Sequence, residues 1–474
     1  MLYAVFAVVL AVTAGLSFLY ARKNEKARLD RIIKIFAVCY IVLSMLDVFL
    51  PDLFMCSHEP DALKGMAGKE LHAVLRWLNL VCFTVLPIAI WQRNKYFERI
   101  ASFFCLPVSI LNAACFYQYI GYFTANSNSG LQTVRVISQG FKDLLVNEAF
   151  RSVFFGLTCL CQLCALILLT YKNRKNLTVA KGELANFFMI LMGVIWISLP
   201  IYVPQYLVGH VSLMMIRFSW VHIAWIVAII AIVLVLYYAF RNKSYDARYI
   251  MLLALSWALM MQFSQMFTAS AELNIMKLPL QLCNLGSYLA LIMLLTRNEK
   301  IYHFTLVVNV VGAILAIIIL DIEKDISHIS RLWVVHYVVE HTKVLVIPVL
   351  CLLLKIFKPI DLKSIKHFSI GFTGYFLFVL VLGTVSNGLY RLCEGEAIQN
   401  FFYANHLFMF DKVIAKRLLG FTDPLFENCV LRLGAFELYP LVQTLVYVVY
   451  MSLSIGVYFL IYALTKSKKT EKKR

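Results

Sequence analysis

One cysteine and one histidine, in separate apolar segments, have the residue types that nucleophilic catalysis requires. Cys283 lies in the run PLQLCNLGSYLALIMLL, residues 279–295, and His341 lies in the run VVEHTKVLVIP further along the chain. A thiol is a strong nucleophile near neutral pH once a base takes its proton, and imidazole is the commonest such base. The amides of Gln281 and Asn284 are neutral donors for an oxyanion, although a helix turns only one of them the same way as Cys283. We therefore predict a site with Cys283 as nucleophile and His341 as general base.

Further polar residues lie near the outer ends of neighbouring apolar segments. They are His222, Gln262, Gln265 and Asn387, whereas the inner halves of the segments around the site are nearly pure hydrocarbon. Polar side chains within hydrocarbon are costly, and a cluster at one depth favours a site that opens toward the headgroups of one leaflet. A pore would need polar residues at all depths. A cysteine in a membrane helix is more often a packing residue, so the alternative in which Cys283 and His341 only pack stays open.

The segment HYVVEH, with His336, Glu340 and His341, has a spacing that suits metal ligation. His336 and Glu340 lie four residues apart on one helix face, but only two ligands are assured, so we predict neither a metal nor another cofactor. We expect Glu340 instead to orient a histidine or to pair with Lys343.

The composition excludes a soluble globular protein. Of the 474 residues 61% are apolar and only 15% are charged, and the mean hydropathy is +0.78. These values are typical of a protein that crosses a membrane many times. The net charge is +18, and the excess Lys and Arg residues lie between the apolar segments. We therefore expect these residues to bind anionic lipid at one membrane face, and we expect no nucleic acid partner.

Apolar segments of about 20 residues, the length that a helix needs to cross hydrocarbon, recur along the whole chain. They lie near 2–20, 33–50, 71–91, 100–123, 150–170, 184–205, 216–240, 249–270, 278–296, 301–320, 332–354, 368–390 and 438–464. Lys and Arg gather in every second connection and in the tail KSKKTEKKR, and such residues mark the cytoplasmic side. The sequence thus predicts an all-α polytopic membrane protein with about thirteen transmembrane helices, its N-terminus outside and its C-terminus inside. Residues 1–20 lack a basic leader, so we expect a first span there rather than a cleaved signal.

The spacing of the segments divides the chain into four parts. We expect an accessory bundle of about five spans at 1–182, an extra span and linker at 183–214, a seven-span module at 215–466, and a basic cytoplasmic tail at 467–474. Two longer outside segments interrupt the short loops, at 124–149 and 391–437. The second contains NFFYANHLFMFDKVIAKRLLGF, which suits an interfacial helix or a loop packed over the bundle, and it also holds Cys393 and Cys429, whose pairing the sequence leaves open.

A weak similarity between two short segments raises the question of an internal repeat. LRWLNL at 75–80, followed by Arg93 and Asn94, resembles LQLCNL at 280–285, followed by Arg297 and Asn298, with a shift of one residue. If the repeat is real, Leu78 takes the place of Cys283, and the first half has no nucleophile at this position. If it is not, the similarity reflects only the shared composition of apolar segments.

Six short motifs in the second half resemble the YwaF-like bacterial membrane proteins. They are RFSWVHIAW, LPLQLCNL, VVEHTKVLVIP, SNGL, ANHLFMF and ELYP, and they occur in the family's order over residues 215–466. Two positions depart from the family: Gln281 stands where a histidine is usual, and His406 stands where the family has tyrosine.

Eukaryotic relatives of that family are membrane acyltransferases that remodel phospholipids with a cysteine and a histidine in these two spans. The resemblance implies that Cys283 accepts the acyl chain as a thioester, that His341 is its base, and that a lysolipid hydroxyl or water takes the chain. It also matches Asn387 and Asn405 to asparagines of the family. We therefore expect an acyltransferase-like protein of the cell membrane, acting on phospholipids or lysophospholipids of the outer leaflet.

The predicted substrate-binding residues are Gln281, Asn284, His222, Gln262, Asn387 and Asn405. Two other classes of protein stay open as alternatives. One is a non-catalytic membrane protein, such as a transporter or an assembly factor, and the other is a membrane lipase or esterase that passes the chain to water. The sequence does not determine the oligomeric state.

Overall fold

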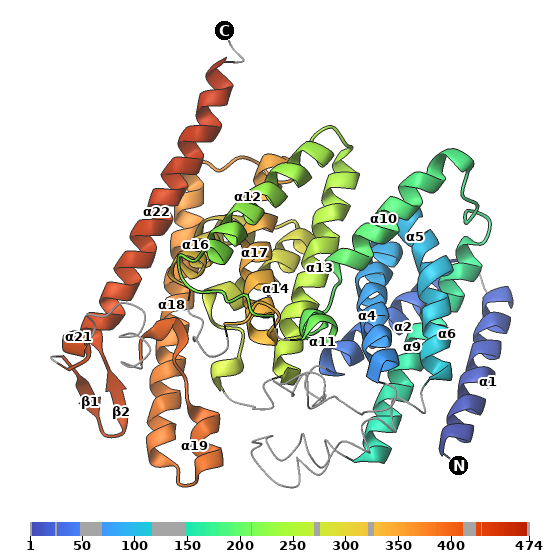
Figure 1. The fold of residues 1–474 in the computed structure, drawn as a ribbon, viewed down its shortest axis with the longest axis horizontal. Helices are drawn as coiled ribbons and strands as arrows, with labels where there is room; N and C mark the ends of the chain where they lie inside the picture. The colour runs from blue at the N-terminus through green and yellow to red at the C-terminus, as the bar shows by residue number, and fades with distance from the viewer. Residues whose placement is uncertain are drawn as a thin grey trace. The chain divides into compact units, whose positions relative to one another are not determined.

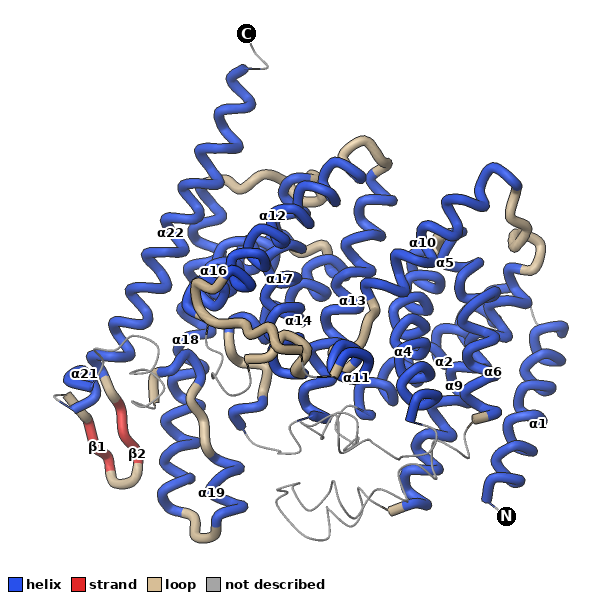
Figure 2. The backbone as a smooth tube through the Cα atoms, in the orientation of Figure 1, coloured by secondary structure: helices blue, strands red, loops and turns tan. Residues whose placement is uncertain are grey.

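The protein is almost entirely helical in the part of the chain that the computed structural model describes (Figure 1). That part comprises residues 2–23, 26–47, 69–115, 147–209, 211–269, 275–320, 327–410, 423–427 and 429–471. Its one named sheet is a short antiparallel hairpin of β1 (Leu431–Leu433) and β2 (Phe436–Leu438), drawn in red in Figure 2. The predicted all-α fold class is therefore confirmed.

The chain forms two compact units. The first comprises Met1–His210 together with Trp257–Ala271, and the second comprises Val211–Ser256 together with Glu272–Arg474. Helix α13 (Tyr245–Ala269) therefore begins in the second unit and ends in the first. The domain boundaries proposed from the sequence stay a prediction.

The first unit is a bundle in which α9 packs against α1 and α2. Its elements in chain order are α1 (Leu2–Lys23), α2 (Lys26–Asp47), α4 (Lys69–Pro87), the π-helix Ile88–Gln92, α5 (Lys95–Ile100), the π-helix Ala101–Cys105, α6 (Leu106–Ala114), α9 (Glu148–Asn173), the 3-10 helix Lys181–Glu183, α10 (Leu184–Ile197) and α11 (Val203–Val208). Buried amides join three of these helices, because Asn112 and Gln162 both donate to Asn79 Oδ1.

The second unit is built around α17, which packs against α12, α14 and α16. Its elements in chain order are α12 (Trp220–Phe240), the first part of α13, the 3-10 helix Ile275–Lys277, α14 (Leu282–Thr296), α15 (Glu299–Phe304), the π-helix Thr305–Asn309, α16 (Val310–Ile319), α17 (Leu332–Leu353), α18 (Leu362–Leu392), α19 (Glu396–Phe402), the 3-10 helix His406–Phe408, α21 (Asp423–Glu427), the β1–β2 hairpin and α22 (Pro440–Glu471).

Many of these helices can span a membrane. Among the described residues, nine helices or runs of consecutive helices are long and apolar enough to do so, and α14 is a shorter apolar helix. Each of the predicted apolar segments overlaps one helix or one run of helices, which supports a multi-pass membrane protein. The total of about thirteen spans and the orientation of the termini stay predictions.

The two units contain hairpins with the same local conformations. Arg93 and Arg297 end the first helix of each hairpin in the left-handed region, with φ of 50° and 52°. Asn94 and Asn298 then cap the next helix, and each cap's side chain accepts hydrogen bonds from the two N–H groups two and three residues later. In both units a six-residue α-helix leads into a five-residue π-helix and then into α-helix again.

These matching positions share one constant offset along the chain, and they support the internal repeat that the sequence only suggested. This offset differs by one residue from the offset that aligns LRWLNL with LQLCNL. It is Asn79, rather than Leu78, that takes the place of Cys283 in the first unit. The first unit therefore carries a neutral amide where the second carries a thiol.

Candidate functional site

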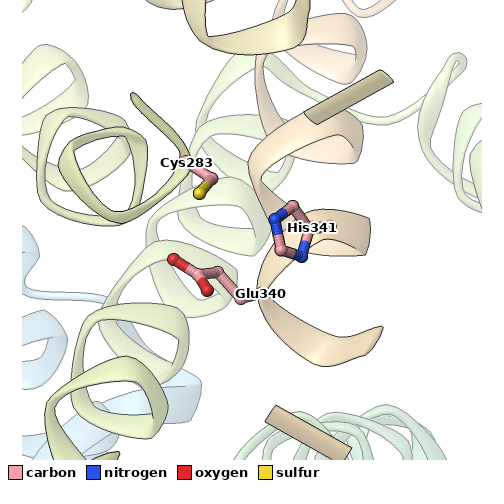
Figure 3. Close-up of side chains that lie close together, drawn as sticks. All are labelled: Cys283, Glu340 and His341. Atoms are coloured by element: carbon pink, nitrogen blue, oxygen red, sulfur yellow. The ribbon is translucent and has the colours of Figure 1, made fainter. Parts of the chain in front are cut away.

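A thiol, a carboxylate and an imidazole meet between two helices of the second unit. Cys283 comes from α14, and Glu340 and His341 come from α17 (Figure 3). One donor atom from each lies within 4.8 Å of the others. Glu340 and His341 are buried, with 3% and 4% of their surfaces exposed, and Cys283 is half-buried. The structure thus brings together the two residues predicted as nucleophile and base, and it adds a buried acid.

A glycine allows the two helices to come this close. A Cβ atom on Gly286 would lie 2.8 Å from Val344 Cγ1 and 3.2 Å from Asn309 Nδ2, so no larger residue fits there without movement. Gly286 lies one turn after Cys283, and Val344 lies one turn after Glu340 and His341. The tight contact therefore sets the separation of the reactive side chains.

Cys283 lies in the first turn of α14. The predicted apolar segment begins at 278, but α14 begins at Leu282 and Gln281 is its N-cap. The first N–H bonded within the helix is that of Leu285, which donates to Gln281 O at 2.8 Å. The earlier N–H groups have no partner along the helix, and this end of a helix favours negative charge. The backbone around Cys283 therefore suits a thiolate or an oxyanion.

The thiol itself donates a hydrogen bond to Asn284 Oδ1 at 3.3 Å. Asn284 was predicted as a donor to an oxyanion or as a substrate ligand, and its role stays a prediction. Here its oxygen acts as the acceptor that orients the neutral thiol.

A backbone hydrogen bond selects the tautomer of His341. Its Nδ1 lies 2.7 Å from the carbonyl oxygen of Tyr337, which has no proton of its own to donate. Nδ1 must therefore carry the proton in the neutral ring, and Nε2 keeps a free lone pair. This is the protonation state that a general base requires.

The two carboxylate oxygens of Glu340 have different surroundings. Its Oε2 lies 3.2 Å from His336 Nε2, four residues earlier on α17. Its Oε1 is buried and has no hydrogen-bond partner among the described residues. Glu340 thus contacts a histidine, as the HYVVEH spacing predicts, whereas its burial beside Cys283 depends on the packing of α14 against α17 and cannot be read from one helix.

Gln281 and Asn387 hold a loop that we call the strap, residues 403–410. Gln281 donates to Asn405 O at 3.3 Å and accepts from Leu407 N at 3.0 Å. Asn387 donates to Ala404 O at 2.6 Å and accepts from Ala404 N at 3.3 Å. Both amides therefore satisfy the backbone of the strap, and their predicted roles in substrate binding stay predictions.

A hydrogen bond within the strap also holds its own conformation. Asn405 Oδ1 accepts from Phe410 N at 3.0 Å, and Leu407 and Phe408 adopt positive φ of 56° each. The described part of the predicted segment 400–421 ends at residue 410, so the prediction of an interfacial helix falls mostly outside the described residues. Cys393 and Cys429, left open as a pair, are both free thiols.

Two other predicted residues have partners of their own. His222 lies 2.6 Å from Ile317 O through Nε2, and its Nδ1 accepts from Phe218 N at 3.0 Å, so it joins α12 to α16. Gln262 belongs to the first unit, where it donates to the carbonyls of Ile197 and Leu199. The structure does not bring either of them into the cluster of Cys283, Glu340 and His341.

The fold and the cluster define a multi-pass membrane protein in which a thiol, an imidazole and a carboxylate meet between two helices. The chain belongs to the TMEM164 family, whose family model matches residues 217–462, more than half of its length. This match contains both α14 and α17 and lies within the predicted seven-span module. No curated protein and no solved structure matches the chain. The finer resemblance to YwaF-like proteins stays a prediction.

Proposed function

We propose that the protein is an acyltransferase that moves a fatty acyl chain between membrane phospholipids through a thioester on Cys283. The observation that carries this proposal is the pairing of a thiol in the first turn of α14 with a histidine whose Nε2 is unprotonated. The apolar helices of the family support a lipid substrate over a soluble one. The resemblance noted in the sequence supports the same reaction.

The proposed reaction has two half-reactions that use the same two side chains. In the first, the Cys283 thiol gives its proton to His341 Nε2, the sulfur attacks an ester carbonyl of the phospholipid, and the proton then goes to the departing lysolipid oxygen. In the second, His341 takes the proton of a lysolipid hydroxyl, which attacks the thioester and restores the thiol. Free N–H groups in the first turn of α14 would stabilise the oxyanion of each step.

The site would act on the outer leaflet of the cell membrane. This follows from the proposed topology, in which the N-terminal end of α14 faces outward. The partners are then phospholipids as donors and lysophospholipids as acceptors. If water replaced the lysolipid, the same chemistry would be that of a lipase.

The proposal is tested with protein purified in detergent micelles and incubated with radiolabelled phospholipid. We expect an acyl adduct that hydroxylamine removes, that Cys283→Ser loses and that Cys393→Ser, a free thiol elsewhere in the same unit, retains. His341→Gln should slow adduct formation by about 100-fold to 10,000-fold. A wild-type protein without any adduct, or an adduct that survives in Cys283→Ser, would contradict the proposal. If free fatty acid is released at the same rate with and without added lysolipid, the protein is a hydrolase and not a transferase.

A further inference from the structure

We infer that Cys283, Glu340 and His341 form a zinc-binding site, and that bound zinc blocks the nucleophile. The binding of zinc follows from the geometry alone. Its regulatory consequence rests on the proposed function, because a blocked nucleophile matters only if Cys283 reacts.

The donor set is one that zinc prefers. Zn²⁺ binds thiolate sulfur, imidazole nitrogen and carboxylate oxygen, and three protein ligands with one open position are typical of its non-structural sites. Mg²⁺ and Ca²⁺ prefer oxygen ligands throughout, so a set with sulfur and nitrogen disfavours them. The three donor atoms already lie within 4.8 Å of one another. Donors around a tetrahedral zinc ion lie about 3.5 Å apart, so no pair has to close by more than about 1.3 Å.

The unpartnered oxygen of Glu340 is an independent sign of a missing cation. Oε1 is buried in a side chain with 3% of its surface exposed, and no described residue donates to it. A buried carboxylate oxygen without a donor or a cation is unfavourable, and native proteins rarely leave one. A zinc ion between Glu340 and the other two donors would satisfy it.

The surroundings orient the ligands as the outer partners of metal sites do. His336 holds the second oxygen of Glu340, and the Tyr337 carbonyl holds Nδ1 of His341, which leaves Nε2 for the metal. Such contacts fix the tautomer and the orientation of metal ligands. HYVVEH by itself offered two ligands, and the fold supplies the third from α14.

Binding would exchange one proton for one metal ion at Cys283. The thiol loses the proton that it now donates to Asn284, that proton passes to solvent, and a sulfur–zinc bond forms. With zinc on Cys283 and His341, neither the nucleophile nor the base is available. Acylation should therefore fall as zinc is added and return when a chelator removes it.

Zinc binding is measured first without reference to activity. Protein in detergent micelles is freed of metal with EDTA and titrated with Zn²⁺ against a chromophoric chelator, and Cd²⁺ is used as a second probe because a cadmium–thiolate bond absorbs in the ultraviolet. We expect one strong zinc per chain and a cadmium band that Cys283→Ser removes but Cys393→Ser keeps. Glu340→Gln, similar in size and unable to ligate as an anion, should weaken binding at least about tenfold, and His336→Gln about 10-fold to 100-fold.

The outcomes separate this inference from the proposed function. If Cys283→Ser and Glu340→Gln, each shown to be folded by gel filtration, bind zinc as tightly as the wild type, the zinc site is refuted even if acylation proceeds in EDTA. If these variants lose zinc but the wild type forms no acyl adduct in EDTA, the zinc site stands and the acyltransferase proposal falls. Acylation that increases with zinc would overturn the blocking role.

Discussion

Gly286 on α14 and Val344 on α17 touch at a point where a single added methyl group would come within 2.8 Å of the valine. This contact lies one turn away from Cys283 on one helix and from Glu340 and His341 on the other. The distance between the helices at Gly286 therefore determines whether sulfur and imidazole can meet. A residue with no functional group thus controls the geometry of the site.

We predict that Gly286→Ala reduces both stability and acylation. Overpacking of this kind costs about 1–3 kcal/mol, and a misplacement of about 1 Å can slow a reaction about 100-fold. Thermal unfolding in detergent and the rate of adduct formation measure the two effects. Gly374→Ala on α18 is the matched control, because a Cβ there meets nothing within 4 Å and a helical alanine is itself favourable. Equal effects of the two substitutions would show that the contact does not position the site.

The free lone pair on His341 Nε2 predicts a reactive thiol even without substrate. We expect His341→Gln to slow alkylation of Cys283 by iodoacetamide about 100-fold, because the base that takes the thiol proton is lost. Peptide mass spectrometry follows Cys283 and Cys393 in the same sample. The rate at Cys393 should not change, and a parallel fall at both thiols would point to altered folding instead of a lost base.

Gln281 should control the mobility of the strap. Gln281→Ala removes one donor and one acceptor from the backbone of residues 405 and 407, which should lower the local free energy of opening by about 1–3 kcal/mol. Amide hydrogen exchange of peptides from residues 403–410 measures the change. Gln399→Ala on α19, whose side chain bonds to Cys393 O outside the strap, should leave that exchange unaltered. Unchanged protection in Gln281→Ala would mean that other contacts hold the strap.

The strap should also loosen in acid. Burial lowers the pKa of His406 from 6.5 to about 4. An open strap exposes His406, which then takes up a proton near pH 6.5, whereas the closed strap takes one up only near pH 4. The free energy of opening the strap therefore decreases by up to about 3 kcal/mol as the pH falls from 6.5 to 4. It does not decrease further below pH 4.

Hydrogen exchange of the strap at several pH values, corrected for the intrinsic rate, tests this dependence. His406→Gln should remove it while keeping a side chain of similar size. A wild-type strap with the same protection at pH 7 and pH 4.5 would contradict the prediction.

The amide cluster of the first unit should matter for folding but not for chemistry. Asn79→Ala removes the shared acceptor of Asn112 and Gln162. Gln162 keeps its hydrogen bond to the Tyr40 hydroxyl, whereas the buried amide of Asn112 loses its acceptor, which costs about 1–3 kcal/mol. We expect a lower unfolding temperature with the rate of adduct formation per folded molecule preserved. Loss of adduct formation in a fully folded variant would show that the first unit takes part in the reaction.

The sequence predicted the helices well and their ends less well. Apolar length alone located the segments, because a membrane span must be long and apolar to satisfy its backbone in lipid. The predicted segment 278–296 begins four residues before α14, and Gln281, just before the helix, bonds instead to a strap more than 100 residues later in the chain. No local pattern reveals such a long-range contact.

The pairing of Cys283 with His341 was also accessible from the sequence, because both residues fall in the outer halves of their predicted segments and the family resemblance pairs them. The burial of Glu340 and the two hydrogen bonds of His222 were not, since they depend on which faces of α12, α16 and α17 meet. Helix-to-helix contacts of this kind are set by small residues such as Gly286, whose significance appears only when the opposite helix is known.

The shortness of α14 has a consequence for how a lipid would reach Cys283. Its 15 residues rise only about 22 Å, whereas a bilayer's hydrocarbon is about 30 Å thick. The irregular chain before it is tied down by the Tyr375 hydroxyl, which donates to Leu280 O, as membrane-embedded loops require. The sulfur would thus lie recessed beneath the phosphate plane, level with glycerol ester bonds. We expect a phospholipid to diffuse in sideways and be cleaved without being extracted from its leaflet.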